Sequence, residues 1–187
     1  MWVMNDYHNN REWVKEYTDN VVFYDKKGEN VGSNIYDYMS YIVDNYDNLP
    51  EVTLFGKTNM LSRHITKEEF DKVVNNTTFT PLLTKNHKTD GVINYYEDGL
   101  YYERNDSWYF HHYDKHYSNY GEVAKELGLP NPKYLGFAPG ACYIVPRASI
   151  HKHSNEYYVK IKNMVSHSEN PAEAHAIERS LYNIWKP

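Results

Sequence analysis

The chain of 187 residues contains 41% hydrophobic and 24% charged side chains, which is typical of a globular protein with one core. Its formal net charge is −5 and its lysines and arginines are scattered, which argues against nucleic-acid binding through phosphate neutralisation. No apolar stretch approaches the ~20 residues of a membrane span, and Asp6, His8 and Arg11 interrupt the N-terminus too early for a signal peptide.

The sole cysteine, Cys142, cannot form an internal disulfide, which fits a reducing compartment. We therefore expect a single domain over residues 1–187, located in the cytoplasm, with no nucleic acid among its partners. The 20 tyrosines have two interpretations. Their flat rings and hydroxyls suit sugar or base binding, whereas AT-rich codon usage raises tyrosine together with asparagine, lysine and isoleucine.

Three short apolar runs separated by helical patterns predict the first third of the fold. Residues 2–4, 21–24 and 52–55 are predicted as strands. Residues 9–17 predict a short helix, and apolar residues at helical spacing predict a longer helix over 33–49. Strands that alternate with helices favour parallel pairing with right-handed crossovers. The sequence therefore predicts an α/β fold with a mixed, mainly parallel sheet flanked by helices.

The pattern after residue 60 is less regular. A capping box at Thr66–Glu69 predicts the start of a helix. Asp98-Gly99 predicts a hairpin turn between strands at 93–96 and 100–102. The other expected elements are a strand within 136–145 and helices over 121–127, 155–165 and 171–185.

Polar residues follow the predicted parallel strands at their carboxyl ends, where open α/β sheets bind ligands. A glycine-containing loop also opens the long helix, whose N-terminus favours an anion such as a diphosphate. Arginine binds phosphate bidentately. Arg147, which follows the predicted strand at 143–145, is therefore a further candidate for binding an anion. The candidate ligand-binding residues are Asn5, Asp6, Asn30, Gly32, Ser33, Lys57, Asn59 and Arg147. The alternative is that these residues are ordinary helix caps, turns and surface charges.

Three further groups have two interpretations each. Asp44 and Asp47 suit a cation or lie in solvent at a helix end. Glu178-Arg179 suits a ligand or forms an internal ion pair that holds the last helix to the sheet. The third group consists of the histidines His111, His112, His116, His151 and His153. Their imidazoles suit zinc, but the spacing sets no third ligand and the sequence has no H-E-x-x-H motif.

Several of these segments resemble one known family, the domain of unknown function 3431. The family pattern N-x-G-R-E is similar to Asn30–Asn34, and its D-N-Y-D-x-L-P helix end is similar to Asp44–Pro50. Its G-A-x-F-x-V-x-R strand is similar to Gly140–Arg147, and its closing helices are similar to Tyr157-Tyr158 and Ile177–Arg179 with Trp185. The resemblance is spread over most of the chain and is most specific at Asp44–Pro50.

The resemblance implies a Rossmann-like fold similar to GT-A type glycosyltransferases. It implies a nucleotide-sugar donor near Asp6, Asn30 and Gly32, with Glu178 or Arg179 at the edge of the site. The acceptor would be a glycan or glycoprotein, since related small transferases of large viruses and capsule loci decorate surface glycans. The chain departs from the pattern at Ser33-Asn34, where the family has Arg-Glu.

GT-A enzymes commonly hold Mn²⁺ or Mg²⁺ with an Asp-x-Asp motif, which this sequence lacks. The resemblance therefore implies either a metal-independent enzyme, with Lys57 or an arginine beside the leaving diphosphate, or a protein that has lost activity. We expect the sugar to face the aromatic-rich middle of the chain. A carboxylate would deprotonate the acceptor hydroxyl, and the candidates are Asp106, Glu103 and Glu178. The rivals are a non-catalytic glycan-binding protein and a histidine-based metallohydrolase.

Overall fold

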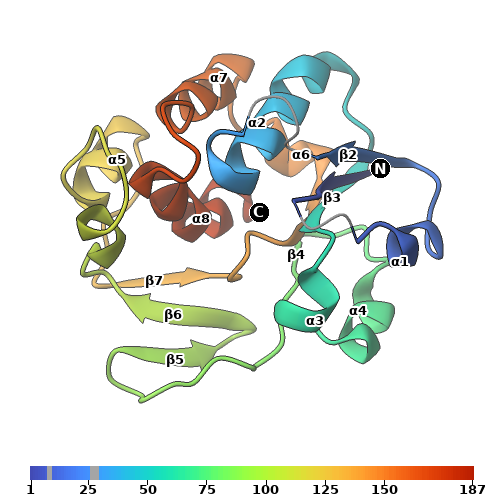
Figure 1. Ribbon diagram of the computed structural model, residues 1–187, viewed down its shortest axis with the longest axis horizontal. Coiled ribbons are helices and arrows are strands. Elements are labelled where there is room, and N and C mark those ends of the chain that lie inside the picture. Colours follow the sequence, from blue (N-terminus) through green and yellow to red (C-terminus); the bar gives the residue numbers. More distant parts are fainter. Residues whose placement is uncertain (8–9, 26–29) are drawn as a thin grey trace.

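The computed structural model describes residues 1–7, 10–25 and 30–187 (Figure 1). The start of the predicted first helix at Asn9 and the glycine-loop residues Gly28 and Glu29 lie outside the described residues. Within the described ranges no helix is both long and apolar enough to cross a membrane.

The first sheet has five strands in the order β2-β1-β3-β8-β4. They are β1 (Trp2–Asn5), β2 (Val21–Tyr24), β3 (Val52–Lys57), β4 (Thr80–Pro81) and β8 (Tyr143–Pro146). β1 pairs in parallel with both β2 and β3, as the sequence predicts. β8 pairs antiparallel with β3 and with β4. The sheet is therefore mixed.

A second sheet is entirely antiparallel, with strands β5 (Asn94–Glu97), β6 (Leu100–Arg104) and β7 (Tyr134–Phe137) in that order. The predicted hairpin turn joins β5 to β6, and its Asp98 and Gly99 both have positive φ, as a two-residue hairpin of this kind requires. The expectation of a mainly parallel sheet is therefore wrong for half of the first sheet and for all of the second.

The direction of β8 follows from its connection to β7. After the turn at 138–142 the chain lies beside the carboxyl end of β3, where Tyr143, the first residue of β8, pairs with Phe55. The chain can then only run back along β3, and Pro146 pairs with Val52 at the other end. Arg147 follows, and its backbone N–H donates to Glu51 O at 2.8 Å. Arg147 thus lies at the end of the sheet opposite the carboxyl ends of the parallel strands.

Helices cover both faces of the first sheet. Successive residues of β1 alternate between two core clusters, with Val3 in the larger one and Trp2 and Met4 in the smaller. The helices are α1 (Glu12–Lys15), α2 (Ser33–Asn45), α3 (Met60–Arg63), α4 (Lys67–Val73), α5 (Tyr120–Glu126), α6 (Arg147–Ile150), α7 (Asn155–Met164) and α8 (Ala172–Trp185). The 3-10 turns η1 (Tyr46–Asn48) and η2 (Trp108–His111) complete the set in the described ranges.

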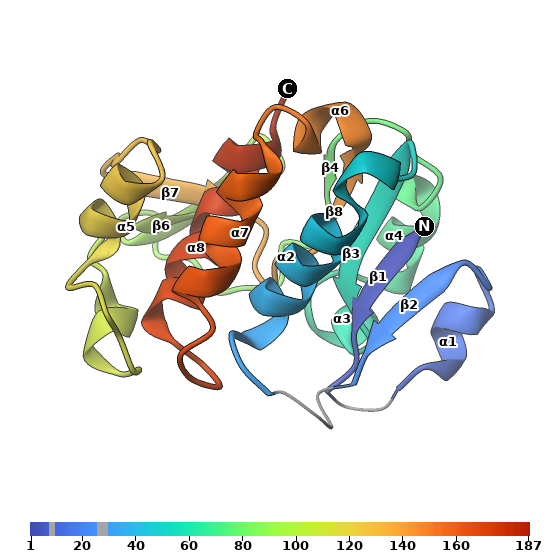
Figure 2. The ribbon, with the colours of Figure 1, turned by 90° about the horizontal axis from the view of Figure 1, so that it is seen from above.

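Helices α2, α7 and α8 lie side by side (Figure 2). Their inner faces form the larger core cluster together with Phe55 of β3 and Tyr143 of β8. α8 also packs on β7 of the second sheet. It therefore connects the two sheets, and the space between its N-terminal half and the carboxyl ends of β1 and β3 is where the candidate site lies.

Candidate functional site

A cleft lies where the carboxyl ends of β1 and β3 meet the N-terminus of α2. It consists of two adjoining pockets, each of about 380 Å³. We call the first the cationic arm, lined by Asn5, Tyr7, Asn30, Asn59 and Glu169 together with the residues shared by both pockets. We call the second the aromatic arm, lined by His64, His87, Tyr101, Glu103, Trp108, Phe137, Pro139, Gly140, Ala174, Glu178 and Arg179 together with the same shared residues. The shared residues are Ser33, Asn34, Lys57, Arg63, Tyr113, Asn170 and His175.

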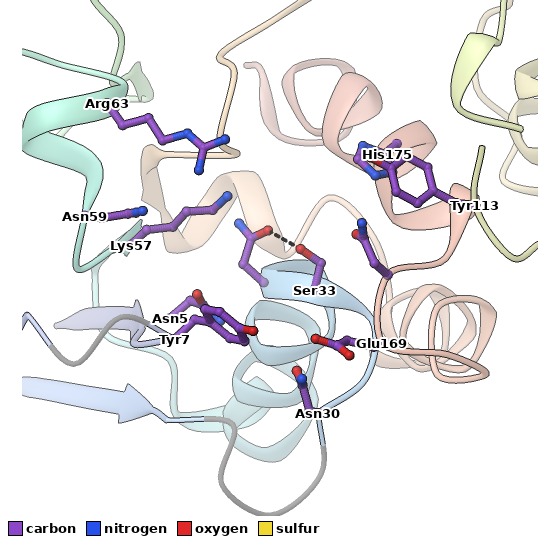
Figure 3. Close-up of a pocket in the computed structure, with 12 residues that line it drawn as sticks. Asn5, Tyr7, Asn30, Ser33, Lys57, Asn59, Arg63, Tyr113, Glu169 and His175 are labelled. Atoms are coloured by element: carbon purple, nitrogen blue, oxygen red, sulfur yellow. Dashed lines mark hydrogen bonds between the residues drawn. The ribbon is translucent and has the colours of Figure 1, made fainter. Parts of the chain in front are cut away.

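Two cations extend into the shared part of the cleft. Lys57 is the last residue of β3, and Arg63 is the last residue of α3, the short helix that follows it. Their side chains enter from one side and face Ser33, while His175 and Tyr113 lie on the other side (Figure 3). Within the described ranges neither cation forms an ion pair with a carboxylate. Both cations are therefore available to a ligand, although the carboxylates Glu169 and Glu178 also line the cleft.

The α2 N-terminus adds partial positive charge to the same place. α2 has 13 residues, and its backbone dipoles favour an anion at its first turn. Gly32 precedes it with φ 64°, and an added Cβ there would lie 2.6 Å from Tyr36 Cβ. Gly32 thus sets the start of the helix but does not line the cleft, whereas the side chains of Asn30 and Ser33 do.

Asparagine amides form much of the cleft surface. Asn5 Nδ2 donates to the buried Asp37 Oδ2 at 2.6 Å, and Asn34 Nδ2 donates to Gly140 O at 3.1 Å. These bonds fix both amides before any ligand arrives. Fixed amide groups can accept from and donate to ligand hydroxyls, so the cleft suits a polar, hydroxyl-rich molecule that carries an anionic group.

Glu178 of α8 lies at the junction of the two arms. Its Oε1 accepts the Gly140 N–H at 2.5 Å, and its Oε2 has no hydrogen-bond partner among the described residues. Burial by itself would raise the pKa of Glu178, but Arg179, Lys57, His175 and the Gly140 N–H outweigh it and hold that pKa below its usual value. The side chain is therefore a carboxylate at neutral pH, with one oxygen available.

The buried Arg179 forms an ion pair with the partly buried Glu103 in the wall of the aromatic arm. Arg179 Nη2 lies 3.0 Å from Glu103 Oε1 and 2.9 Å from Oε2. The guanidinium also lies 4.7 Å from the Tyr109 ring and 4.8 Å from the Phe137 ring. Trp108 Nε1 donates to Glu103 Oε1 at 2.7 Å. Glu103 is thus held by two partners, which leaves it poorly placed to take a proton from a substrate.

Two neutral histidines border the cleft. Burial first, then Lys57, lower the pKa of His64 to about 4, and Glu178 acts in the opposite direction. Burial likewise lowers the pKa of His175 to about 4. His175 stacks on Tyr113 with ring centres 4.4 Å apart. Both imidazoles are therefore uncharged at neutral pH, so the positive charge of the cleft comes from Lys57 and Arg63.

The structure gathers most of the residues that the sequence singles out. Asn5, Asn30, Ser33, Lys57 and Asn59 line the cationic arm, and Glu103 and Glu178 line the aromatic arm.

Four of the candidates lie elsewhere. Asp6 is fully buried and pairs with Arg11 instead of facing the cleft. Gly32 lies behind the cleft wall, and Asp106 pairs with Arg104 at 3.9 Å on the outside. Arg147 lies at the opposite end of the sheet, because β8 is antiparallel to β3.

Sequence reasoning missed several lining residues, above all Arg63, His64, Asn170 and His175. A signal existed for two of them. Arg63 follows Lys57 in the segment that leaves β3, and His175 precedes Glu178 and Arg179 at helical spacing, so it shares their face of α8. Asn170 gave no such signal, because only the packing of the segment before α8 brings it to the cleft.

The histidines considered for zinc have other contacts. His151 Nε2 lies 2.9 Å from Tyr46 O, and His153 Nε2 lies 3.2 Å from Ile184 O. His116 stacks on His167 with ring centres 3.9 Å apart. In the part of the chain that the structure describes, no group of three His, Cys, Asp or Glu residues is arranged to hold a metal ion.

Comparison with known proteins gives one family. No curated protein and no solved structure matches the chain. The sequence model of the family described as "Protein of unknown function (DUF3431)" matches residues 1–186, almost the whole chain. The chain therefore belongs to the DUF3431 family.

Proposed function

We propose that the protein is a glycosyltransferase that binds a nucleotide-sugar donor in the cleft and transfers the sugar to a glycan or glycoprotein acceptor. The observation that carries the proposal is the pair Lys57 and Arg63, without carboxylate partners in the described ranges, beside the N-terminus of α2. Two cations and a helix N-terminus suit a diphosphate. The parallel β1, β2 and β3 support a Rossmann-like, GT-A type arrangement of the donor half.

The reaction needs two functions from the protein, a base for the acceptor and positive charge for the leaving diphosphate. An acceptor hydroxyl oxygen attacks the anomeric carbon, the bond from that carbon to the diphosphate oxygen breaks, and the hydroxyl proton moves to a base. Glu178 is our candidate for the base, because its Oε2 has no hydrogen-bond partner in the described part of the chain and its pKa is low enough to keep it ionised. Lys57 and Arg63 would stabilise the negative charge of the leaving diphosphate.

Metal dependence is part of the proposal. The absence of an Asp-x-Asp motif, together with the two cations, supports a reaction in which Lys57 and Arg63 do what Mn²⁺ or Mg²⁺ does in GT-A enzymes. Transfer measured with and without a chelator tests this point, and the expected result is little change in rate. A large loss that Mn²⁺ restores would contradict it.

Calorimetric titration with UDP-, GDP- and TDP-sugars tests donor binding. We expect one of them to bind, and both Lys57→Met and Arg63→Met to weaken it at least tenfold, since each variant removes a cation that contacts the diphosphate. Lys125→Met, which removes an exposed lysine of α5 outside the cleft, should bind like the wild type. Failure of every donor to bind the wild type would reject the proposed function.

Glu178→Gln tests the base. We expect this variant to bind the donor and to lose transfer activity about 10²-fold or more, the usual contribution of a general base. Glu97→Gln, an exposed carboxylate of β5, is the matched control and should transfer at the wild-type rate. Donor binding without transfer by the wild type, to any glycan acceptor, would favour the non-catalytic glycan-binding protein instead.

A further inference from the structure

Trp108 is a large aromatic side chain that is 38% exposed and lines the aromatic arm. It is also held in place. Its Nε1 donates to Glu103 Oε1 at 2.7 Å, and its backbone N–H donates to Asp106 Oδ1 at 3.2 Å. Glu103 is in turn fixed by Arg179, whose guanidinium carbon lies 5.7 Å from the Trp108 ring. The indole is therefore oriented without a ligand.

Apart from Lys57, Arg63 and Glu178, which lie where the two arms meet, the charged groups of this arm compensate one another. The buried Arg179, 5% exposed, balances Glu103, and His64 and His175 are neutral. The rest of this arm consists of apolar walls, which include Tyr101, Phe137 and Pro139, and of the Glu178 oxygen that lacks a partner among the residues that the structure describes. The aromatic arm therefore offers a rigid aromatic face beside a hydrogen-bond acceptor.

These features match the chemistry of an uncharged sugar. A pyranose ring has apolar C–H faces that stack on an aromatic ring, while its hydroxyls point outward to hydrogen-bonding groups. The preorganised indole lowers the entropic cost of binding, because no side chain has to be ordered. Once Lys57 and Arg63 bind the diphosphate of the donor, an anionic sugar would meet the carboxylate of Glu178 with no other unpaired cation among the described residues of this arm to balance it.

We propose that the aromatic arm is a subsite for an uncharged pyranose ring, with Trp108 as its stacking platform and the Glu103–Arg179 pair as the group that positions Trp108. The inference rests on the proposed function in one respect: the ring held there is that of the acceptor. Its hydroxyl would then meet Glu178 at the junction with the cationic arm.

Ligand-observed NMR with methyl β-glucoside, methyl β-galactoside and methyl α-mannoside tests the subsite directly. We expect the wild type to bind at least one of them and, when pyrophosphate occupies Lys57 and Arg63, to bind it more tightly than the corresponding methyl glucuronide. Trp108→Ala should weaken that binding at least fivefold. Trp108→Phe keeps an aromatic ring but loses the hydrogen bond to Glu103, so its affinity for the glycoside should lie between those of the wild type and Trp108→Ala. Unfolding curves of each variant would show that it is folded.

Tyr95→Ala is the matched control. Tyr95 stacks on Tyr102 with ring centres 5.0 Å apart, and neither ring lines the cleft. The control should bind the glycosides like the wild type. The subsite is rejected if no glycoside binds the wild type, if Trp108→Ala binds them unchanged, or if Trp108→Ala loses uridine or guanosine binding instead, which would make Trp108 a platform for a base.

The two proposals fail in different ways. Loss of donor binding in Lys57→Met with unchanged glycoside binding in Trp108→Ala would leave the proposed function intact and remove the subsite. Glycoside binding that depends on Trp108, in a protein that binds no nucleotide sugar, would leave the subsite intact and remove the transferase.

Discussion

Glu103 shows how the role of a single residue changes once its neighbours are known. The sequence places it near Trp108 and makes it a candidate base, whereas the structure pairs it with the buried Arg179. Removing one partner of a buried ion pair leaves the other charge unpaired in a low-dielectric environment. Its contribution should therefore be to stability and to the position of Trp108.

Glu103→Gln should lower the free energy of unfolding by about 3 kcal/mol, because Arg179 would keep its charge and lose its carboxylate. Urea unfolding monitored by far-UV circular dichroism measures the change. The same variant should keep donor binding in the cationic arm, which Glu103 does not line. A variant as stable as the wild type but without transfer activity would restore Glu103 as the base.

His64 should make stability depend on pH. Its pKa is about 4 in the folded protein and about 6.5 when exposed, so the unfolded chain takes up a proton first as pH falls. The stabilising contribution is complete above pH ~6.5 and is lost as pH falls toward 4, by roughly 3 kcal/mol in total. His64→Leu should flatten the wild-type decline in unfolding free energy between pH 7 and pH 4.5.

Urea titrations of both proteins across that range provide the test. Above pH 7.5 the imidazole is neutral in both states, so the slopes with pH of the variant and the wild type should agree there. An unchanged acid slope in the variant would show that other groups cause the decline.

At the scale of elements, the turn at 138–142 fixes the floor of the cleft. Gly140 has φ 89° and Ala141 has φ 58°, both in the left-handed region. The Gly140 N–H binds Glu178 and its carbonyl accepts from Asn34, so the turn connects α8 with α2. An added Cβ at Gly140 would lie 2.5 Å from the His64 ring.

Gly140→Ala should therefore destabilise the protein by two separate effects, backbone strain and contact with His64, each about 1–2 kcal/mol. Gly128→Ala is a suitable comparison, because Gly128 also has positive φ (65°) but nothing lies within 4 Å of the added Cβ. It should show the strain alone. Thermal unfolding of both variants gives the difference, and equal losses would contradict the contact with His64.

Local patterns predicted most elements but not how they pair. The β1, β2 and β3 strands, the long α2, the capping box of α4 and the β5–β6 hairpin follow from short-range signals, and the structure confirms them. The direction of β8 does not, because it depends on where the turn after β7 delivers the chain. The error at Arg147 has the same origin. Asn5, Lys57 and Asn59 were predictable because parallel strands bring their exits to one edge.

At the scale of the whole molecule, α8 connects the two sheets. Its Arg179 pairs with Glu103 of β6, while its Trp185 stacks on Phe55 of β3 with ring centres 5.2 Å apart. We therefore expect the two sheets to unfold together. Transitions in urea followed by far-UV and near-UV circular dichroism should coincide. Two separated transitions would show that α8 leaves one sheet before the other unfolds.

Cys142, the residue just before β8, is fully buried, and its Sγ lies 3.5 Å from Gly140 O. Burial raises the pKa of this thiol to about 12, so little of the reactive thiolate exists near neutral pH. The sequence contains no other cysteine. A thiol-reactive dye would then label a molecule only after the turn at 138–142, the floor of the cleft, has opened. The rate of labelling would therefore measure how often that turn opens in the unmodified protein.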